Sequence, residues 1–180
     1  GMSYTTMLPI LAVEFDPQAS GAALGFLFAA GGVGGTLGAL ISGILEGRVR
    51  PVVLLVGGGA LFGLALATFA FLPLFAAVLL VLLFASLGNN IFQVTGQSAL
   101  QSRLPDTYRG RVMGFWSIQF IVFVPLGALG LGAIASAYSP AAALVILGSF
   151  VGIFALLVGA LHAGIRGLGH AGTAEQAKSG

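Results

Sequence analysis

Three long segments of this sequence contain no aspartate, glutamate, lysine or arginine: residues 17–45, 51–102 and 112–165. About 20 apolar residues cross the hydrocarbon core of a bilayer as a helix, so the first segment is long enough for one span and each of the others for two. Hydrophobic residues make up 58% of the chain and charged residues only 7%, which is far outside the composition of a soluble domain. We therefore predict an all-α integral membrane protein with five complete spans.

Proline and cap residues divide the two longer segments. Pro73 separates the first pair of helices, and Ser139 followed by Pro140 is the pattern of an N-cap and a first helical turn. Pro51 and Asp106 open two further helices in the same way. The predicted helices are residues 1–13, 20–45, 51–72, 74–101, 109–138 and 140–165.

The first 13 residues, GMSYTTMLPILAV, are apolar but too short to cross a membrane alone. We interpret them as the outer half of a truncated span, because they lack the positive n-region and cleavage site of a signal peptide. The helices form a predicted bundle over residues 1–168, and the small, polar residues 169–180 predict a disordered tail. With no cysteine, disulfides and thiolate metal sites are excluded. We expect neither a metal nor a cofactor.

All seven basic residues fall on one predicted side of the membrane. Alternate connections must share a side, and the second connection, the region of the fourth and the C-terminal tail carry these residues: Arg48, Arg50, Arg103, Arg109, Arg111, Arg166 and Lys178. The opposite side carries Glu14 and Asp16. This positive-inside pattern places the arginine connections and the C-terminus in the cytoplasm. The net charge of +2 therefore reports topology and gives no reason to expect a nucleic-acid partner.

The helix predicted at residues 74–101 carries a stripe of amides. Asn89, Gln93, Gln97 and Gln101 recur every four residues and share one face, with Asn90 beside them. Amides that face lipid lack partners, at several kcal/mol each, so the stripe must face protein or water. Interhelical hydrogen bonds are one explanation. We favour a water-filled pathway, because interior polar residues in membranes commonly mark substrate routes.

Small residues define a second face, on the helix predicted at residues 20–45. Gly31, Gly35 and Gly38 recur at three- and four-residue spacing, which lets two helix backbones approach closely in lipid.

Pro125 and Gly127 predict close packing or a hinge in the helix at residues 109–138. The helices at 51–72 and 140–165 are almost free of polar residues and are expected to face lipid. Except for Arg109 and Arg111 at the start of residues 109–138, no acidic or basic residue lies inside a predicted helix.

Two sequence motifs resemble those of a known family. QSRLPDTYRGRVMGF, residues 101–115, carries Q-x-x-x-P-D-x-x-R-G-R-V-M-G. It resembles the signature between helices ten and eleven of major facilitator superfamily transporters, and is most similar to the branch of the enterobactin exporter and the macrolide efflux proteins. GILEGRVRPVVLL, residues 43–55, resembles the motif between helices eight and nine, although Glu46 replaces the usual Asp and Pro51 falls in the basic run.

This resemblance implies one half of a major facilitator fold, from within helix seven to helix twelve. It implies a secondary transporter of a bacterial inner membrane that exports a drug-like or siderophore-like solute by alternating access. The implied partners are the lipid bilayer, the N-terminal half of the same transporter or a second copy, a small-molecule solute, and protons bound by acids of the other half. The resemblance also implies that the glycine face of the helix predicted at residues 20–45 contacts the other half.

The resemblance also assigns candidate residues. Asn89, Asn90, Gln93 and Gln97, with Tyr4 and Thr5 from the first segment, are expected to line the substrate pathway. A cytoplasmic charge network is expected to keep the cytoplasmic side closed in the outward-facing state. An ion pair that forms in only one conformation biases a two-state equilibrium toward that conformation. The members of the network are Glu46, Arg48, Arg50, Asp106, Arg109 and Arg111. Asp106 alone is equally explained as a helix cap.

Two alternatives remain open from the sequence. One is a stand-alone six-helix half-transporter or assembly subunit, in which the glycine face of helix 20–45 pairs with a second copy. The other is a rhomboid-like intramembrane serine protease, because Ser98 lies in a Gly-x-Ser-x element and His162 lies near the same membrane face. A catalytic dyad would need these two side chains within hydrogen-bond reach.

Overall fold

The protein is all-helical over the part of the chain that the computed structural model describes, which is residues 5, 8–15, 20–68, 72, 74–102 and 106–176. The helices are α1 (Leu8–Phe15), α2 (Ser20–Leu45), α3 (Pro51–Thr68), α4 (Phe75–Gln101), α5 (Asp106–Ala137) and α6 (Pro140–Gln176). Four stretches in α2, α3, α4 and α6 are long and apolar enough to cross a membrane, and α5 adds the shorter apolar stretch Ile121–Ala137. This confirms the predicted all-α membrane class.

The helix ends follow local signals in the sequence. Ser139 caps α6, since the backbone N–H of Ala142 donates to its Oγ at 3.1 Å, which confirms the predicted cap. Gly47, with a φ of 78°, follows the end of α2, and a glycine tolerates this left-handed conformation best. α6 continues to Gln176, beyond the predicted end at residue 165 and into residues 169–180. Residues 171–176, AGTAEQ, contain no proline and only one glycine to interrupt that helix.

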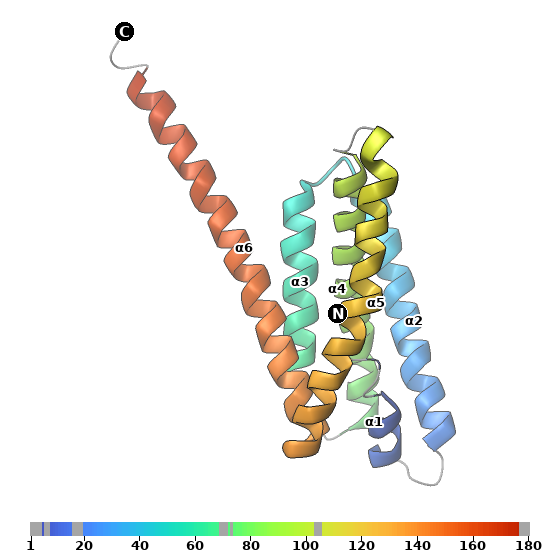
Figure 1. The fold of residues 1–180 in the computed structure, drawn as a ribbon. Helices are drawn as coiled ribbons and strands as arrows, with labels where there is room; N and C mark the ends of the chain where they lie inside the picture. Colours follow the sequence, from blue (N-terminus) through green and yellow to red (C-terminus); the bar gives the residue numbers. More distant parts are fainter. Residues whose placement is uncertain are drawn as a thin grey trace.

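α4 lies at the centre of the arrangement. It packs against α2 on one side and α3 on the other, and α3 in turn packs against α6 (Figure 1). The connection between α2 and α3, the end of α4 and the start of α5 lie at the same end of the molecule. The buried apolar core, which includes Leu27, Leu66, Leu82 and Leu144, lies toward the other end, where α2, α4 and α6 begin.

The glycine face of α2 packs against α4. A Cβ on Gly34 would lie within 3.0 Å of three backbone atoms of Leu83, and one on Gly38 would lie within 3.0 Å of the Leu87 carbonyl oxygen and the Asn90 Cβ. Gly31 and Gly35 face Ser86 and Asn90 in the same contact. The expectation that this face contacts another half or a second copy is therefore wrong, because α4 of the same chain already occupies it.

A second glycine contact, which was not among the predicted ones, joins α3 to α6. A Cβ on Gly63 would lie within 2.7 Å of backbone atoms of Gly148 and Gly152. The signal is present in the sequence, because residues 59–63 and 148–152 each read G-x-x-x-G, a pattern that brings membrane helices together. α3 therefore lies between α4 and α6 and exposes only its remaining face, with Val53 and Leu64.

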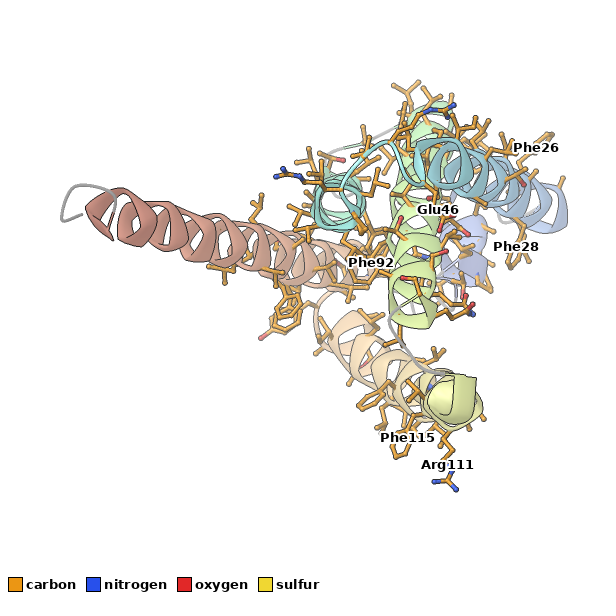
Figure 2. All side chains as sticks on the ribbon, turned by 90° about the horizontal axis from the view of Figure 1, so that it is seen from above. Phe26, Phe28, Glu46, Phe92, Arg111 and Phe115 are labelled. Atoms are coloured by element: carbon orange, nitrogen blue, oxygen red, sulfur yellow. The ribbon has the colours of Figure 1, made fainter. Side chains whose placement is uncertain are left out.

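α5 stands apart from α2, α3 and α4. Among the main helix contacts its partner is α6, near the turn that joins the two helices. From above, Phe115 and Arg111 point away from the other helices (Figure 2). Phe115 is 77% exposed and Ile121 is 73% exposed, so most of this helix presents apolar side chains outward. Pro125 lies inside α5 and is exposed, and its predicted role as a hinge stays a prediction.

Candidate functional site

A cavity of about 480 Å³ lies between α3, α4 and α6. Small residues at the helix contacts, Gly59, Gly96 and Ala155, leave room for it, and the rings of Phe62, Phe92 and Phe154 form much of its wall. Its size falls within the range of small-molecule sites. We call it the α3–α4–α6 cavity.

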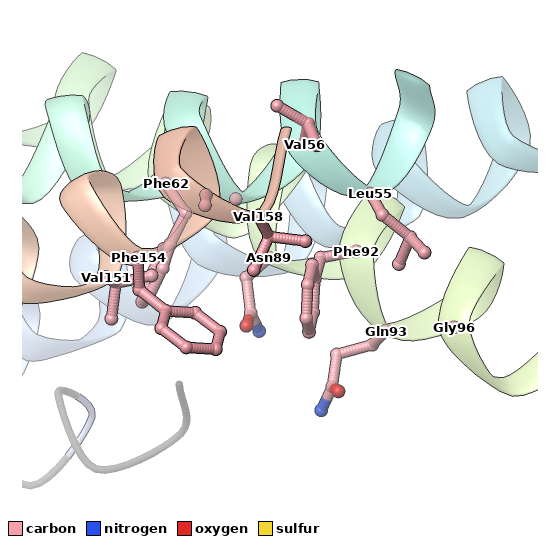
Figure 3. A pocket seen from close by; sticks show the side chains of 12 residues that line it. Leu55, Val56, Phe62, Asn89, Phe92, Gln93, Gly96, Val151, Phe154 and Val158 are labelled. Atoms are coloured by element: carbon pink, nitrogen blue, oxygen red, sulfur yellow. The ribbon is translucent and has the colours of Figure 1, made fainter. Parts of the chain in front are cut away.

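Two amides of the predicted stripe are the polar side chains of this cavity. Asn89 is only 9% exposed, and Gln93, one turn further along α4, is half-buried. In Figure 3 both amides project from α4 toward the same side, with the ring of Phe92 between them and that of Phe154 beside Asn89. An amide offers two donors and one acceptor oxygen with two lone pairs. The cavity therefore combines aromatic walls with amide groups that fix the orientation of a ligand.

The other two predicted amides of α4 lie elsewhere. Asn90 donates from Nδ2 to the Ser86 carbonyl oxygen at 3.1 Å and packs against Gly35 and Gly38 of α2, so it serves the contact between α2 and α4 and does not line the cavity. Gln97 is exposed at the surface of the described chain. Thr5 is half-buried, whereas Tyr4 lies outside the described residues.

The predicted charge network is only partly described. Glu46, Arg48 and Arg50 lie in the connection between α2 and α3 and are exposed, and Arg111 is exposed at the start of α5. The Arg48 guanidinium donates to the Ile44 carbonyl oxygen at the end of α2. Among these four side chains no ion pair is formed in the structure. The side chains of Asp106 and Arg109 lie outside its description, so the gating role of this network stays a prediction.

The aromatic walls of the α3–α4–α6 cavity were not anticipated from the sequence. Phe62 and Phe154 belong to helices that were expected to face lipid because they carry so few polar residues. Their positions relative to the glycines offer the signal: Phe62 precedes Gly63, and Phe154 follows Gly152 by two residues. A side chain next to a close helix contact lies at the edge of the interface, where a cavity between helices forms.

Comparison with known proteins assigns the family. The model of the Major Facilitator Superfamily matches residues 1–174. The enterobactin exporter EntS of Salmonella choleraesuis (strain SC-B67) is 32% identical over 153 residues, which cover 84% of this chain and 36% of that protein. EntS of Escherichia coli O1:K1 / APEC is 30% identical over 144 residues, 80% of this chain and 34% of that protein. No solved structure matches.

The protein of Citrobacter koseri with the same name is 29% identical over 152 residues, 84% of this chain and 36% of that protein. The chain thus spans about a third of the length of the curated relatives it matches. Because the matched family is one of transporters and the relatives are exporters, the interpretation of Ser98 and His162 as a protease dyad is excluded. Ser98 lies on α4, and the side chain of His162 lies outside the described residues.

Proposed function

The chain belongs to the major facilitator superfamily, and we propose that it is the C-terminal half of an exporter that moves a drug-like or siderophore-like solute out of the cell by alternating access. In this proposal α1 is part of helix seven and α2 to α6 are helices eight to twelve. The cellular location is a bacterial inner membrane, with the arginine connections and the C-terminus in the cytoplasm. The names of the relatives support an exported solute of the siderophore class.

The observation that carries the proposal is the pair of amides, Asn89 and Gln93, in the otherwise apolar lining of the α3–α4–α6 cavity. An amide in an apolar setting costs several kcal/mol unless it is hydrogen-bonded, so the buried Asn89 and the half-buried Gln93 are explained by a ligand with hydrogen-bonding groups. The surrounding phenylalanine rings favour a ligand that also carries aromatic or apolar groups. A drug-like or siderophore-like solute that combines rings with amides or hydroxyls meets both conditions.

Export by cells that produce the complete protein tests this proposal. Enterobactin and a macrolide are the two probes. Asn89→Ala and Gln93→Ala are expected to lower the export rate at low solute concentration about tenfold each, the effect of losing one hydrogen bond of about 1.4 kcal/mol. Gln101→Ala is the matched control, because Gln101 lies on the same helix outside the cavity. The proposal fails if neither probe is exported, or if all three variants export like the unchanged protein.

The size of the native polypeptide tests whether this chain is one half. We expect an immunoblot against the C-terminal tail to detect a band near twice 18.1 kDa or above under denaturing conditions. A band at 18.1 kDa would favour a stand-alone half-transporter that pairs with a second copy. Such a pair could not use the glycine face of α2, because α4 covers it, and would need the exposed face of α5 instead.

In the complete transporter the two halves rock against each other around the solute. The exposed face of α5 is the surface of this chain that the N-terminal half would cover. Glu46, Arg48, Arg50 and Arg111 supply charges for a cytoplasmic gate, with Asp106 and Arg109 as further members by family resemblance. Since no acidic residue lies inside the described spans, proton coupling would use acids of the N-terminal half.

A further inference from the structure

A second, smaller cavity lies at the predicted cytoplasmic end, between the ends of α2 and α4 and the start of α3. Its volume is about 220 Å³, and the residues that line it include several that carry hydroxyl groups. Ser42 comes from α2, Thr95 and Ser98 from α4, and Ser102 from the end of α4. Glu46 contributes a carboxylate and lies between α2 and α4 when the molecule is viewed from above (Figure 2). We call this cavity the hydroxyl pocket.

Two of these hydroxyls are buried without a partner. Ser42 is 3% exposed and Thr95 is 7% exposed, and neither the Ser42 Oγ nor the Thr95 Oγ1 makes a hydrogen bond with the part of the chain that the structure describes. Other helical hydroxyls of this chain donate to a carbonyl oxygen three or four residues earlier, the usual solution in apolar surroundings. Thr36 bonds to Gly32 and Ser136 to Ala133 in this way. The two orphaned oxygens of the hydroxyl pocket therefore call for a ligand.

The donor set identifies the class of ligand. Hydroxyl and carboxylate oxygens are hard donors that suit hard cations. α2 and α4 both end at this pocket and α3 begins there, so two negative helix-dipole ends and one positive end meet at it and on balance favour positive charge. In some membrane transporters, the C-terminal ends of half-helices near the bilayer midplane coordinate Na⁺. Arg48 does not fill the pocket, since its guanidinium donates to Ile44 while Gly47 and Val49 line the wall.

Charge balance selects a monovalent ion. Divalent cations in proteins are normally held by several carboxylates, whereas Glu46 is the one acidic residue among the described residues that line this pocket. Within the described residues no group of three or more histidine, cysteine, aspartate or glutamate side chains could hold a metal. The volume has room for an ion with several waters at about 30 Å³ each. We propose that the hydroxyl pocket binds one Na⁺, held by Ser42, Thr95 and the carboxylate of Glu46.

Direct binding of radioactive ²²Na⁺ to the complete purified protein tests this proposal, with choline chloride holding the ionic strength constant and no solute present. We expect saturable binding of about one ion per chain. Ser42→Ala, Thr95→Val and Glu46→Gln should each weaken it at least about tenfold, as expected for the loss of one ligand. Thr36→Val and Ser136→Ala are matched controls, because they remove hydroxyls that already have partners outside the pocket, and should bind Na⁺ normally.

Thermal stability gives an independent measurement in case a variant folds poorly. Without Na⁺, Ser42→Ala and Thr95→Val should melt at or above the temperature of the unchanged protein, because each removes an unpaired buried hydroxyl. At the same Na⁺ concentration, the melting temperature of the unchanged protein should rise and those of the two variants should rise less.

Three results would overturn the proposal: no saturable Na⁺ binding, which would mean that the pocket holds water only; equal binding by the pocket variants and the controls; or equal loss of binding in both groups. A role for this ion in coupling rests on the proposed exporter function, but Na⁺ binding does not. Failure of the export assay with intact Na⁺ binding would therefore reject the solute assignment and leave this site standing.

Discussion

Replacing Gly34 by alanine tests the central contact of the fold, between α2 and α4. The added Cβ would lie within 3.0 Å of three backbone atoms of Leu83, against 3.4–4 Å for an ordinary contact. Backbone atoms of a helix cannot rotate away, so the two helices must separate along their contact. Forcing an extra methyl group into a packed interior costs about 1–3 kcal/mol, and we expect Gly34→Ala to lower the free energy of unfolding by that amount.

Gly32, two residues earlier on α2, provides the matched control. No heavy atom lies within 4 Å of a Cβ placed there, so Gly32→Ala should gain about 0.5–1 kcal/mol from the higher helix propensity of alanine. The two variants carry the same chemical change and are predicted to shift stability in opposite directions. Only the packing around the added methyl group differs between the two positions.

Unfolding in mixed micelles of increasing dodecyl sulfate content, followed by circular dichroism, measures both variants under the same conditions. The reasoning about backbone contact is refuted if Gly34→Ala is as stable as Gly32→Ala, or more stable. A loss in both variants would also count against it, because the second has no contact to lose.

Two further predictions concern α6. Gly63→Ala should lower the free energy of unfolding by about 1–3 kcal/mol, since its Cβ would meet backbone atoms of Gly148 and Gly152, while Gly57→Ala, with open space around its Cβ, should not; the same micelle titration compares them. Ser139→Ala should cost about 1 kcal/mol by removing the N-cap of α6, whereas Ser139→Asp should retain most of that stability in the same titration.

Much of the fold could be predicted because charge and proline signals are local. A residue such as Pro51 sets the start of α3 through its own fixed φ and missing N–H, and Ser139 caps the helix that follows it. The assignment of faces to partners could not be predicted in the same way. A glycine face specifies close approach but not the helix that approaches, so the face of α2 was matched by family resemblance to the wrong neighbour.

The candidate site was predictable to a similar extent. Asn89 and Gln93 were identified because an amide inside a membrane must face protein or water. The phenylalanine walls and the hydroxyl pocket depend on how three helices pack together. The spacing of residues within a single helix does not predict that packing. Ser42 illustrates the difference, because a serine in an apolar helix usually bonds to its own backbone and only the three-dimensional structure shows that this one does not.

The amides of α4 show how one polar segment serves two purposes. Adjacent residues on a helix differ by about 100° in direction, and Asn89 and Asn90 face different neighbours. Asn89 and Gln93 face the α3–α4–α6 cavity, whereas Asn90 bonds to Ser86 and fills the space beside Gly35. The number of amides in this segment therefore overstates the width of the face that lines the cavity. A variant of Asn90 should alter stability through the contact between α2 and α4, while a variant of Gln93 should alter the handling of solute.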